Sequence, residues 1–92
     1  MFLGFEKKRL ISDNCEIFLV EKGEGIPLIL LHGFPQTHAM WSEVAPSLSK
    51  NYRVICPDLR GYGKSGKPLG YKNYSFRNMA KDVIAILVVF KY

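Results

Sequence analysis

Cysteine is scarce in this sequence and is not arranged for cross-linking or metal binding. Only Cys15 and Cys56 are present, 41 positions apart, and no CxxC pair occurs. A disulfide-stapled domain or a zinc site needs several cysteines at close, regular spacing. We therefore expect both thiols to stay reduced, and we predict no metal site and no cofactor.

Long hydrophobic runs are also missing. The longest, Val83–Phe90, has eight residues, whereas a membrane-spanning helix needs about 20. The apolar start of the chain is interrupted by Glu6 and has no basic region before it, so no signal peptide is indicated. We expect a cytoplasmic protein with no membrane partner.

The charge balance does not indicate a nucleic-acid partner. Thirteen Lys and Arg against eight Asp and Glu leave a formal net charge of +5. Such a surplus attracts polyanions only when the basic side chains share one face. The one dense basic group, Lys7 to Arg9, precedes Leu10 and Ile11 in a strand-like stretch, so we interpret it as a solvated strand face.

The composition and length are those of one small globular domain. Of the 92 residues, 48% are hydrophobic and 23% are charged, which is too hydrophobic for a disordered tail. Two short β-rich stretches, Glu6–Ile11 and Cys15–Val20, flank a turn cluster at 12–14 and predict an antiparallel hairpin. The continuous apolar run Pro27–Leu31 is typical of a strand in the middle of a sheet.

A helix and a further strand follow. Between Thr37 and Ser49 the apolar residues recur at helical spacing, and Pro46 predicts a broken or kinked helix there. Tyr52–Cys56 reads as a strand ended by Pro57, so the strand, helix, strand order predicts parallel neighbours and an α/β fold. A last helix, capped by Ser75, is expected to turn a row of apolar residues inward: Phe76, Met79, Val83, Ile86 and Phe90.

The segment LLHGFPQT, residues 30–37, takes a strand directly into a glycine and then a helix. A turn of this kind leaves backbone N–H groups unpaired, and the missing Cβ of Gly33 lets a substrate oxygen approach. The N–H of Phe34 is the candidate oxyanion-hole donor, and its ring would line an apolar pocket. Alternatively, Gly33 and Pro35 only shape a tight connection.

The segment DLRGYGKSG, residues 58–66, matches G-x-G-x-x-G at Gly61, Gly63 and Gly66. No helix opens at the last glycine, and the residue five positions before Gly63 is not the glycine that a P-loop requires. We therefore interpret it as a surface loop whose glycines adopt positive φ. In this loop Asp58 and Arg60 are expected to fix each other or nearby backbone.

The segments HGFPQTHAMW, VAPSL, DLRGYGKSGKP and YSFRNMAKD follow one another in fixed order between about Leu10 and Ile86. Together they resemble the α/β-hydrolase fold and, more narrowly, the haloacetate (fluoroacetate) dehalogenases, with the soluble epoxide hydrolases next. The resemblance implies that Phe34 supplies an oxyanion-hole N–H and that His32 and Gly33 are the motif's structural pair. An apolar Phe34 argues against the haloalkane dehalogenases, which usually carry a polar halide-binding residue there.

The resemblance also implies the chemistry. In these enzymes an Asp on a nucleophile elbow attacks carbon, halide or epoxide oxygen leaves, and a His-activated water cleaves the aspartyl ester. The nucleophile, acid and His all lie downstream of the matching segment, and no G-x-S-x-G or G-x-D-x-G elbow occurs in the 92 residues. We therefore interpret His32 and His38 as loop or structural residues.

Residues 1–92 are accordingly interpreted as a truncated α/β-hydrolase core domain without its cap domain and C-terminal half. Alone it is expected to be inactive, with a small-molecule substrate bound only in the complete enzyme. In the resembled fold the next strand would pair onto Pro27–Leu31, so we expect an open sheet edge there, with marginal stability, self-association or a requirement for a complementary partner as the consequence. The alternatives are an epoxide hydrolase fragment, or a noncatalytic protein-interaction module that uses this edge.

Overall fold

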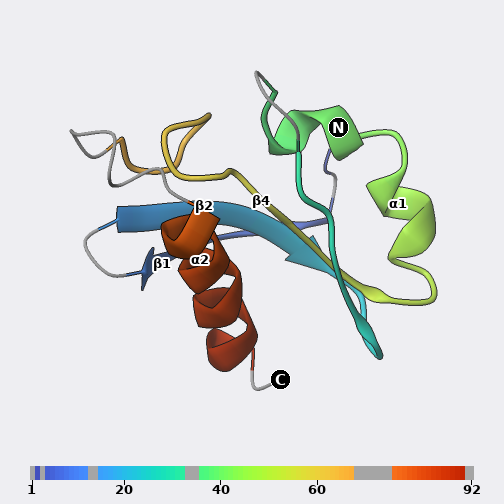
Figure 1. The fold of residues 1–92 in the computed structure, drawn as a ribbon. Helices are drawn as coiled ribbons and strands as arrows, with labels where there is room; N and C mark the ends of the chain where they lie inside the picture. The colour runs from blue at the N-terminus through green and yellow to red at the C-terminus, as the bar shows by residue number, and fades with distance from the viewer. Residues whose placement is uncertain (1, 3, 13–14, 33–35, 68–75, 91–92) are drawn as a thin grey trace.

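The computed structural model describes residues 2, 4–12, 15–32, 36–67 and 76–90. Its core is a four-stranded mixed sheet in the order β1-β2-β4-β3, covered on its two faces by short helices (Figure 1). Strands β1 (Glu6–Ser12) and β2 (Cys15–Lys22) pair antiparallel, which confirms the predicted hairpin. Asp13 and Asn14 of the expected turn lie outside the described residues.

Strand β3 (Pro27–Ile29) pairs parallel with β4 (Arg53–Pro57), and β4 pairs antiparallel with β2. The expected α/β fold with parallel neighbours is therefore present. Pro27–Leu31, which the sequence predicts to be central only in a complete sheet, begins with β3 at the end of the sheet among the described residues, which agrees with the expected open edge. Its side chains are only half-buried, and Leu31 is 45% exposed. A continuous apolar run is typical of a strand that is covered on both faces of a complete sheet. Among the described residues β3 pairs with β4 alone, so its side chains are less covered than in a complete sheet.

The connection from β3 to β4 is broken, as Pro46 predicted. A 3-10 helix η1 (His38–Trp41) is followed by the four-residue helix α1 (Ala45–Leu48), in whose first turn Pro46 lies. The Thr37 hydroxyl accepts a hydrogen bond from the N–H of Ala39 at 3.2 Å and caps η1. Met40 and Val44, which have helical spacing in the sequence, are exposed because the break turns them away from the sheet.

Helix α2 (Phe76–Val89) lies on the opposite face of the sheet, packed against β1 (Figure 1). Ile86 and Phe90 are buried there, as predicted, while Met79 and Val83 are only half-buried. Ser75, the predicted cap, lies outside the described residues. Asp82 is also buried on the inward side of α2. The apolar periodicity of the sequence did not predict its burial.

The two faces of β2 hold two separate cores because successive side chains of a strand point to opposite sides. Ile17 and Leu19 pack with Ile86 and Phe90 beneath α2. The opposite face buries a second group under η1 and α1: Phe18, Val20, Ala45, Val54 and Cys56.

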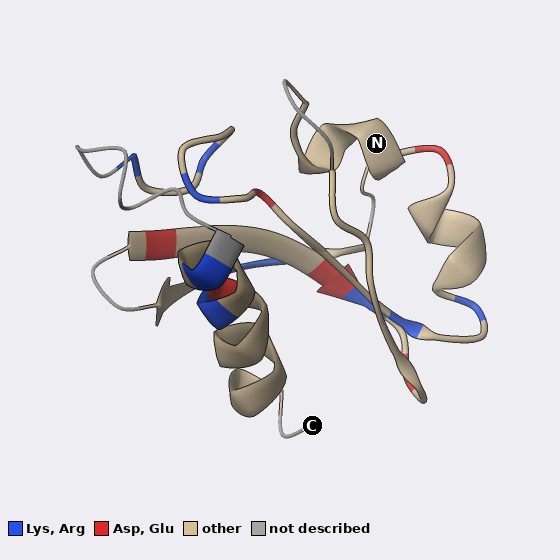
Figure 2. Ribbon diagram, in the orientation of Figure 1, with Lys and Arg blue, Asp and Glu red and all other residues tan. Residues whose placement is uncertain are grey.

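No helix of the described residues is long and apolar enough to span a bilayer. Figure 2 shows basic residues spread over strands, loops and α2 rather than gathered on one element.

Candidate active-site loops

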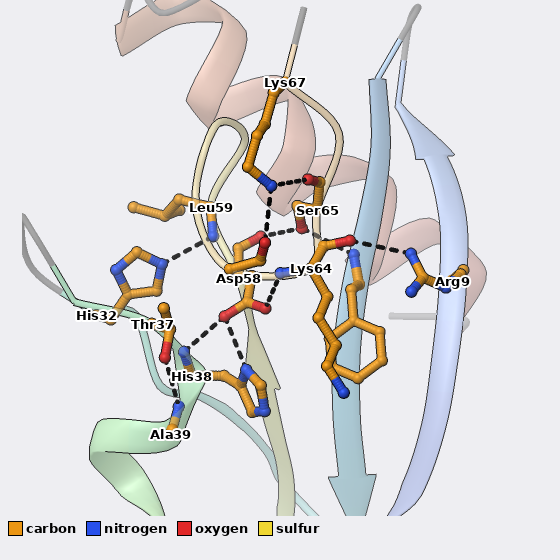
Figure 3. A network of polar contacts seen from close by, with 12 residues as sticks. Arg9, His32, Thr37, His38, Ala39, Asp58, Leu59, Lys64, Ser65 and Lys67 are labelled. Carbon is orange, nitrogen blue, oxygen red and sulfur yellow. Dashed lines mark hydrogen bonds and ion pairs between the residues drawn. The ribbon is translucent and has the colours of Figure 1, made fainter.

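Asp58 lies just after β4 and is fully buried. Its Oδ1 accepts hydrogen bonds from the backbone N–H of His38 at 2.6 Å and contacts His38 Nδ1 at 2.7 Å (Figure 3). Its Oδ2 accepts from the N–H of Lys64 at 2.9 Å. One carboxylate thus ties the end of β4 to the start of η1 and to the loop that follows β4, and these contacts offset the cost of burying its charge.

Ser65 joins the same loop to the sheet. Its hydroxyl donates to the carbonyl of Asp58 at 2.6 Å and accepts from the N–H of Phe18 at 2.8 Å. The N–H of Asp58 in turn donates to the carbonyl of Phe18 at 2.8 Å. The loop after β4 is therefore fixed to β2 through hydrogen bonds that need no other protein segment.

His32, at the end of the β3 segment, is buried and also binds this loop. Its Nε2 accepts a hydrogen bond from the N–H of Leu59 at 2.9 Å (Figure 3). Because a backbone N–H can only donate, Nε2 carries no proton here and the neutral ring holds its proton on Nδ1. The ring also packs edge-on to Tyr62, at 5.3 Å between centroids. These contacts support the structural role expected for His32.

The predicted donor turn, Gly33, Phe34 and Pro35, lies outside the described residues. What the structure shows is how its flanks are held. His32 on one side binds Leu59, and His38 on the other side binds Asp58. Two consecutive residues at the end of β4 therefore anchor both ends of the segment that carries the turn.

Gly63 is required by the position of Asp58. It has φ +52°, and a Cβ on it would lie 2.3 Å from Asp58 Oδ2. Gly61 also has positive φ, as the sequence suggested. The same expectation is wrong for Gly66, which does not adopt positive φ and instead lies close to β2, where its N–H donates to the carbonyl of Glu16 at 2.6 Å.

Arg60 corrects another expectation. The sequence predicts that Asp58 and Arg60 fix each other or nearby backbone; Asp58 binds backbone N–H groups, as the second alternative states, whereas the ion pair of Arg60 is with Asp82 of α2. Arg60 Nε donates to Oδ2 at 2.8 Å and Nη2 to Oδ1 at 2.7 Å, and both side chains are buried. The missed signal was the spacing of Asp82, which lies four and eight residues before the buried Ile86 and Phe90.

An apolar cavity of about 540 Å³ adjoins His32. It lies between the end of the β3 segment, the loop after β4 and α2, and its lining residues are Leu31, His32, Leu59, Met79, Val83 and Ile84, with Ala80. The lining contains no charged residue, so this cavity favours apolar groups.

The two thiols are not arranged for nucleophilic or metal chemistry. Burial raises the pKa of the Cys56 thiol from 9.0 to about 12. Burial also raises the pKa of Cys15, against the opposing effect of the Arg60 cation. Both cysteines are free, and the described residues contain no group of three or more His, Cys, Asp or Glu side chains that could hold a metal ion.

Comparisons with known proteins agree with this geometry. The sequence profile of the alpha/beta hydrolase fold family matches residues 26–88. The chain is 52% identical over 85 residues to fluoroacetate dehalogenase from Burkholderia sp, which covers 89% of this chain and 28% of that enzyme. It is 48% identical over 64 residues to the soluble epoxide hydrolase of Corynebacterium sp. (strain C12), covering 70% of this chain and 22% of that enzyme.

Solved structures show the same relationship. The chain matches the protein ALR0039 from Nostoc sp PCC 7120 with a TM-score of 0.95 and 44% identity, over 100% of this chain and 33% of that one. It matches an epoxide hydrolase from Vigna radiata with a TM-score of 0.93 and 29% identity, over 100% and 30% respectively. The chain thus spans about a quarter to a third of the length of the relatives that it matches.

Proposed function

Because this chain belongs to the α/β-hydrolase fold family, we propose that it forms the oxyanion-hole side of a haloacetate dehalogenase active site. The observation that carries the proposal is the anchoring of His32 on Leu59 and of His38 on Asp58, at the carboxyl ends of the parallel strands β3 and β4. Ligands of open α/β sheets bind beyond the carboxyl ends of the strands. The 52% identity to a fluoroacetate dehalogenase favours a haloacetate as substrate.

In the proposed reaction a carboxylate supplied by a nucleophile elbow attacks the carbon that bears the halogen. The carbon–halogen bond breaks, and halide leaves with its electron pair. Water gives a proton to a His and adds to the carbonyl of the aspartyl ester. The ester C–O bond then breaks, the departing glycolate oxygen takes the proton from the His, and the enzyme carboxylic acid loses its proton to solvent, which regenerates the carboxylate. The N–H of Phe34 would donate to the oxygen that becomes negative during the second step.

The 92 residues contain no nucleophile elbow, so we propose that this domain does not turn over substrate alone. Losing a single oxyanion donor costs roughly a hundred- to a thousandfold in rate, and loss of the nucleophile costs far more. Activity would require a segment that supplies the elbow, the acid and the His, together with the cap that closes the pocket.

The experiment is a fusion. Residues 1–86 of this chain are joined to the part of the Burkholderia fluoroacetate dehalogenase that follows the matched region, and fluoride release from fluoroacetate is measured. We expect release from the fusion and none from the chain alone. A folded fusion that releases no fluoride would contradict the proposal.

Two variants of the fusion test the donor. Phe34→Pro removes the N–H and should lower kcat by about a hundredfold or more, because proline has no backbone hydrogen to donate. Phe34→Ala keeps the N–H, removes only the ring, and should retain far more activity. Equal losses of kcat in the two variants would show that the loss comes from the missing ring or from misfolding, and not from the missing N–H donor.

An epoxide hydrolase is the second candidate, favoured by the 48% identity to the Corynebacterium enzyme and by the epoxide hydrolases among the similar structures. The same fusion is assayed for diol release from styrene oxide. Diol without fluoride would select this function. A noncatalytic interaction module remains the third, and specific binding of a protein to the β3 edge without rescue of either reaction would select it.

A further inference from the structure

A second cavity, of about 400 Å³, lies on the sheet face opposite α2. Its lining includes Phe2, Lys7, Phe18, Val20, His38 and Lys64, and we call it the basic cavity. Phe18 and Val20 belong to the core under η1 and α1, whereas α2 packs over Ile17 and Leu19. The basic cavity shares no lining residue with the apolar cavity beside His32.

The charge of the basic cavity is one-sided. Lys7 and Lys64 are exposed at its rim, and its lining contains no acidic residue. Acidic groups on neighbouring residues have partners: Glu6 pairs with Lys8 at 3.6 Å, Glu16 pairs with Arg9 at 2.6 Å, and the buried Asp58 carboxylate accepts from the N–H groups of His38 and Lys64. Among the described residues, no ion pair involves Lys7 or Lys64. Two ammonium groups therefore face this cavity without a neutralising carboxylate.

The walls of the basic cavity are aromatic. The ring of His38 lies 5.4 Å from that of Phe2 and 5.2 Å from that of Phe18, measured between centroids. The Lys64 ammonium lies 5.3 Å from the centroid of Phe18. Figure 3 shows the His38 ring and the Lys64 side chain extending from the same network around Asp58. Flat apolar walls under a positively charged rim are complementary to a flat apolar molecule that carries an anionic group.

We propose that the basic cavity binds a small aromatic anion, with its ring against Phe2 and His38 and its anionic group between the ammonium groups of Lys7 and Lys64. Aromatic carboxylates and phosphate monoesters of aromatic alcohols share this chemistry. The basic cavity shares His38 and Lys64 with the hydrogen-bond network around Asp58, but it shares no residue with the His32–Leu59 contact. Binding of an aromatic anion there does not require the hydrolase reaction.

The test uses 2-naphthoate as the probe, titrated into the full 92-residue chain while backbone amide shifts are followed by NMR. We expect saturable shifts centred on Lys7, Phe18 and Lys64. Lys7→Gln and Lys64→Gln should each weaken binding about fivefold, since a charge-assisted contact is lost. Lys50→Gln, which removes the charge of an exposed lysine that is not part of the cavity lining, should leave binding unchanged.

Further probes test separately whether the anionic group and the aromatic ring of the ligand contribute to binding. The neutral 2-naphthylmethanol should bind more weakly than 2-naphthoate, and inorganic phosphate should bind more weakly than naphthyl phosphate. Shifts centred on Leu31 and Ile84 would place the probe in the apolar cavity and overturn the proposal. The proposal would also be overturned if Lys50→Gln lost as much affinity for 2-naphthoate as Lys7→Gln and Lys64→Gln do. The same holds if inorganic phosphate bound as tightly as the aromatic anions.

Discussion

At the scale of single residues, Asp58 organises the carboxyl end of the sheet. Its carboxylate receives two backbone N–H groups and the His38 ring, and it leaves room for only a hydrogen atom at Gly63. A buried carboxylate with its hydrogen bonds complete is stable, whereas a displaced one loses several charge-assisted contacts at once. The stability of the loop should therefore depend steeply on Gly63.

Gly63→Ala tests this dependence. The new Cβ would collide with the Asp58 carboxylate, so we expect the free energy of unfolding to fall by about 2 kcal/mol or more, measured by urea unfolding with Trp41 fluorescence. Gly25→Ala is the matched control, because Gly25 also has positive φ but the nearest atom to its Cβ is 3.7 Å away. It should cost only about 1 kcal/mol of backbone strain. A Gly63 variant no worse than the Gly25 variant would show that the contact with Asp58 does not matter.

Cys56 allows a second test at this scale. With a pKa of about 12 instead of 9.0, three units higher, its thiolate fraction at pH 8 is about a thousandfold smaller than that of a free thiol. Alkylation by iodoacetamide, located by mass spectrometry, should therefore be slow at pH 8 and become fast in urea. Its rate should still rise about tenfold per pH unit between pH 8 and 10, whereas a free thiol levels off above its pKa of 9.0. An early plateau in the native protein would contradict the burial of this thiol.

At the scale of elements, the fold depends on how α2 is attached to the hairpin and to the loop after β4. Arg60 of the loop after β4 forms a buried ion pair with Asp82, and Ile86 and Phe90 are buried in the core beneath α2 with Ile17 and Leu19 of β2. The Phe90 ring also lies under two cations, with Arg53 at 4.4 Å and Lys8 at 4.9 Å from its centroid. Lys8 therefore does not belong to the solvated face that Lys7 and Arg9 form, since alternate residues of β1 point to opposite sides.

Asp82→Asn should detach α2. It leaves the Arg60 guanidinium buried without a counter-charge, which costs about 3 kcal/mol or more, and we expect a loss of helical circular dichroism at 222 nm and a lower urea midpoint. Glu24→Gln, which neutralises an exposed carboxylate, should change stability by less than about 0.5 kcal/mol.

The double variant Arg60→Met with Asp82→Leu distinguishes the buried charge from the packing. Replacing both partners of a buried ion pair by apolar residues is often neutral, so it should recover most of the stability that Asp82→Asn loses. If it recovers nothing, the specific ion pair, rather than the unpaired charge, holds α2.

At the scale of the whole molecule, the two sheet edges differ. The outer edge of β1 carries Lys7 and Arg9, charges that oppose the pairing of another strand. The outer edge of β3 is apolar. Leu30 donates to Ile55 and the Ile26 carbonyl accepts from Arg53, so the alternate residue Ile29 directs its backbone groups away from β4. Pro27, which has no N–H to leave unpaired, lies on the same outer register.

We therefore propose that the chain self-associates through the β3 edge. Analytical ultracentrifugation should show oligomers whose fraction rises with concentration. Ile26→Lys places a charge at an exposed position beside this edge and should shift the distribution toward monomer. Ile11→Lys, at an equally exposed position of β1, is the control and should not. A single monomeric species at every concentration would contradict the proposal.

Local patterns were sufficient for the elements. Alternation and turn residues predicted the β1–β2 hairpin, Pro46 predicted the break between η1 and α1, and the strand, helix, strand order predicted the parallel pair β3 and β4. These features depend on residues within a few positions of one another, so the sequence carries them directly. The order of the motifs along the chain also indicates the hydrolase family, and the family profile that matches residues 26–88 confirms it.

The partners of the buried charges were decided only in three dimensions. Asp58 and Arg60 are two positions apart in the sequence, yet they bind different partners. Asp58 accepts hydrogen bonds from the N–H groups of His38 and Lys64, whereas Arg60 donates to Asp82, 22 positions away. No periodicity encodes such a choice, because it depends on which elements the sheet brings to one end. The apolar run at Pro27–Leu31 likewise indicates a buried strand, but its burial depends on what pairs with its outer edge, and that is a property of the assembled sheet.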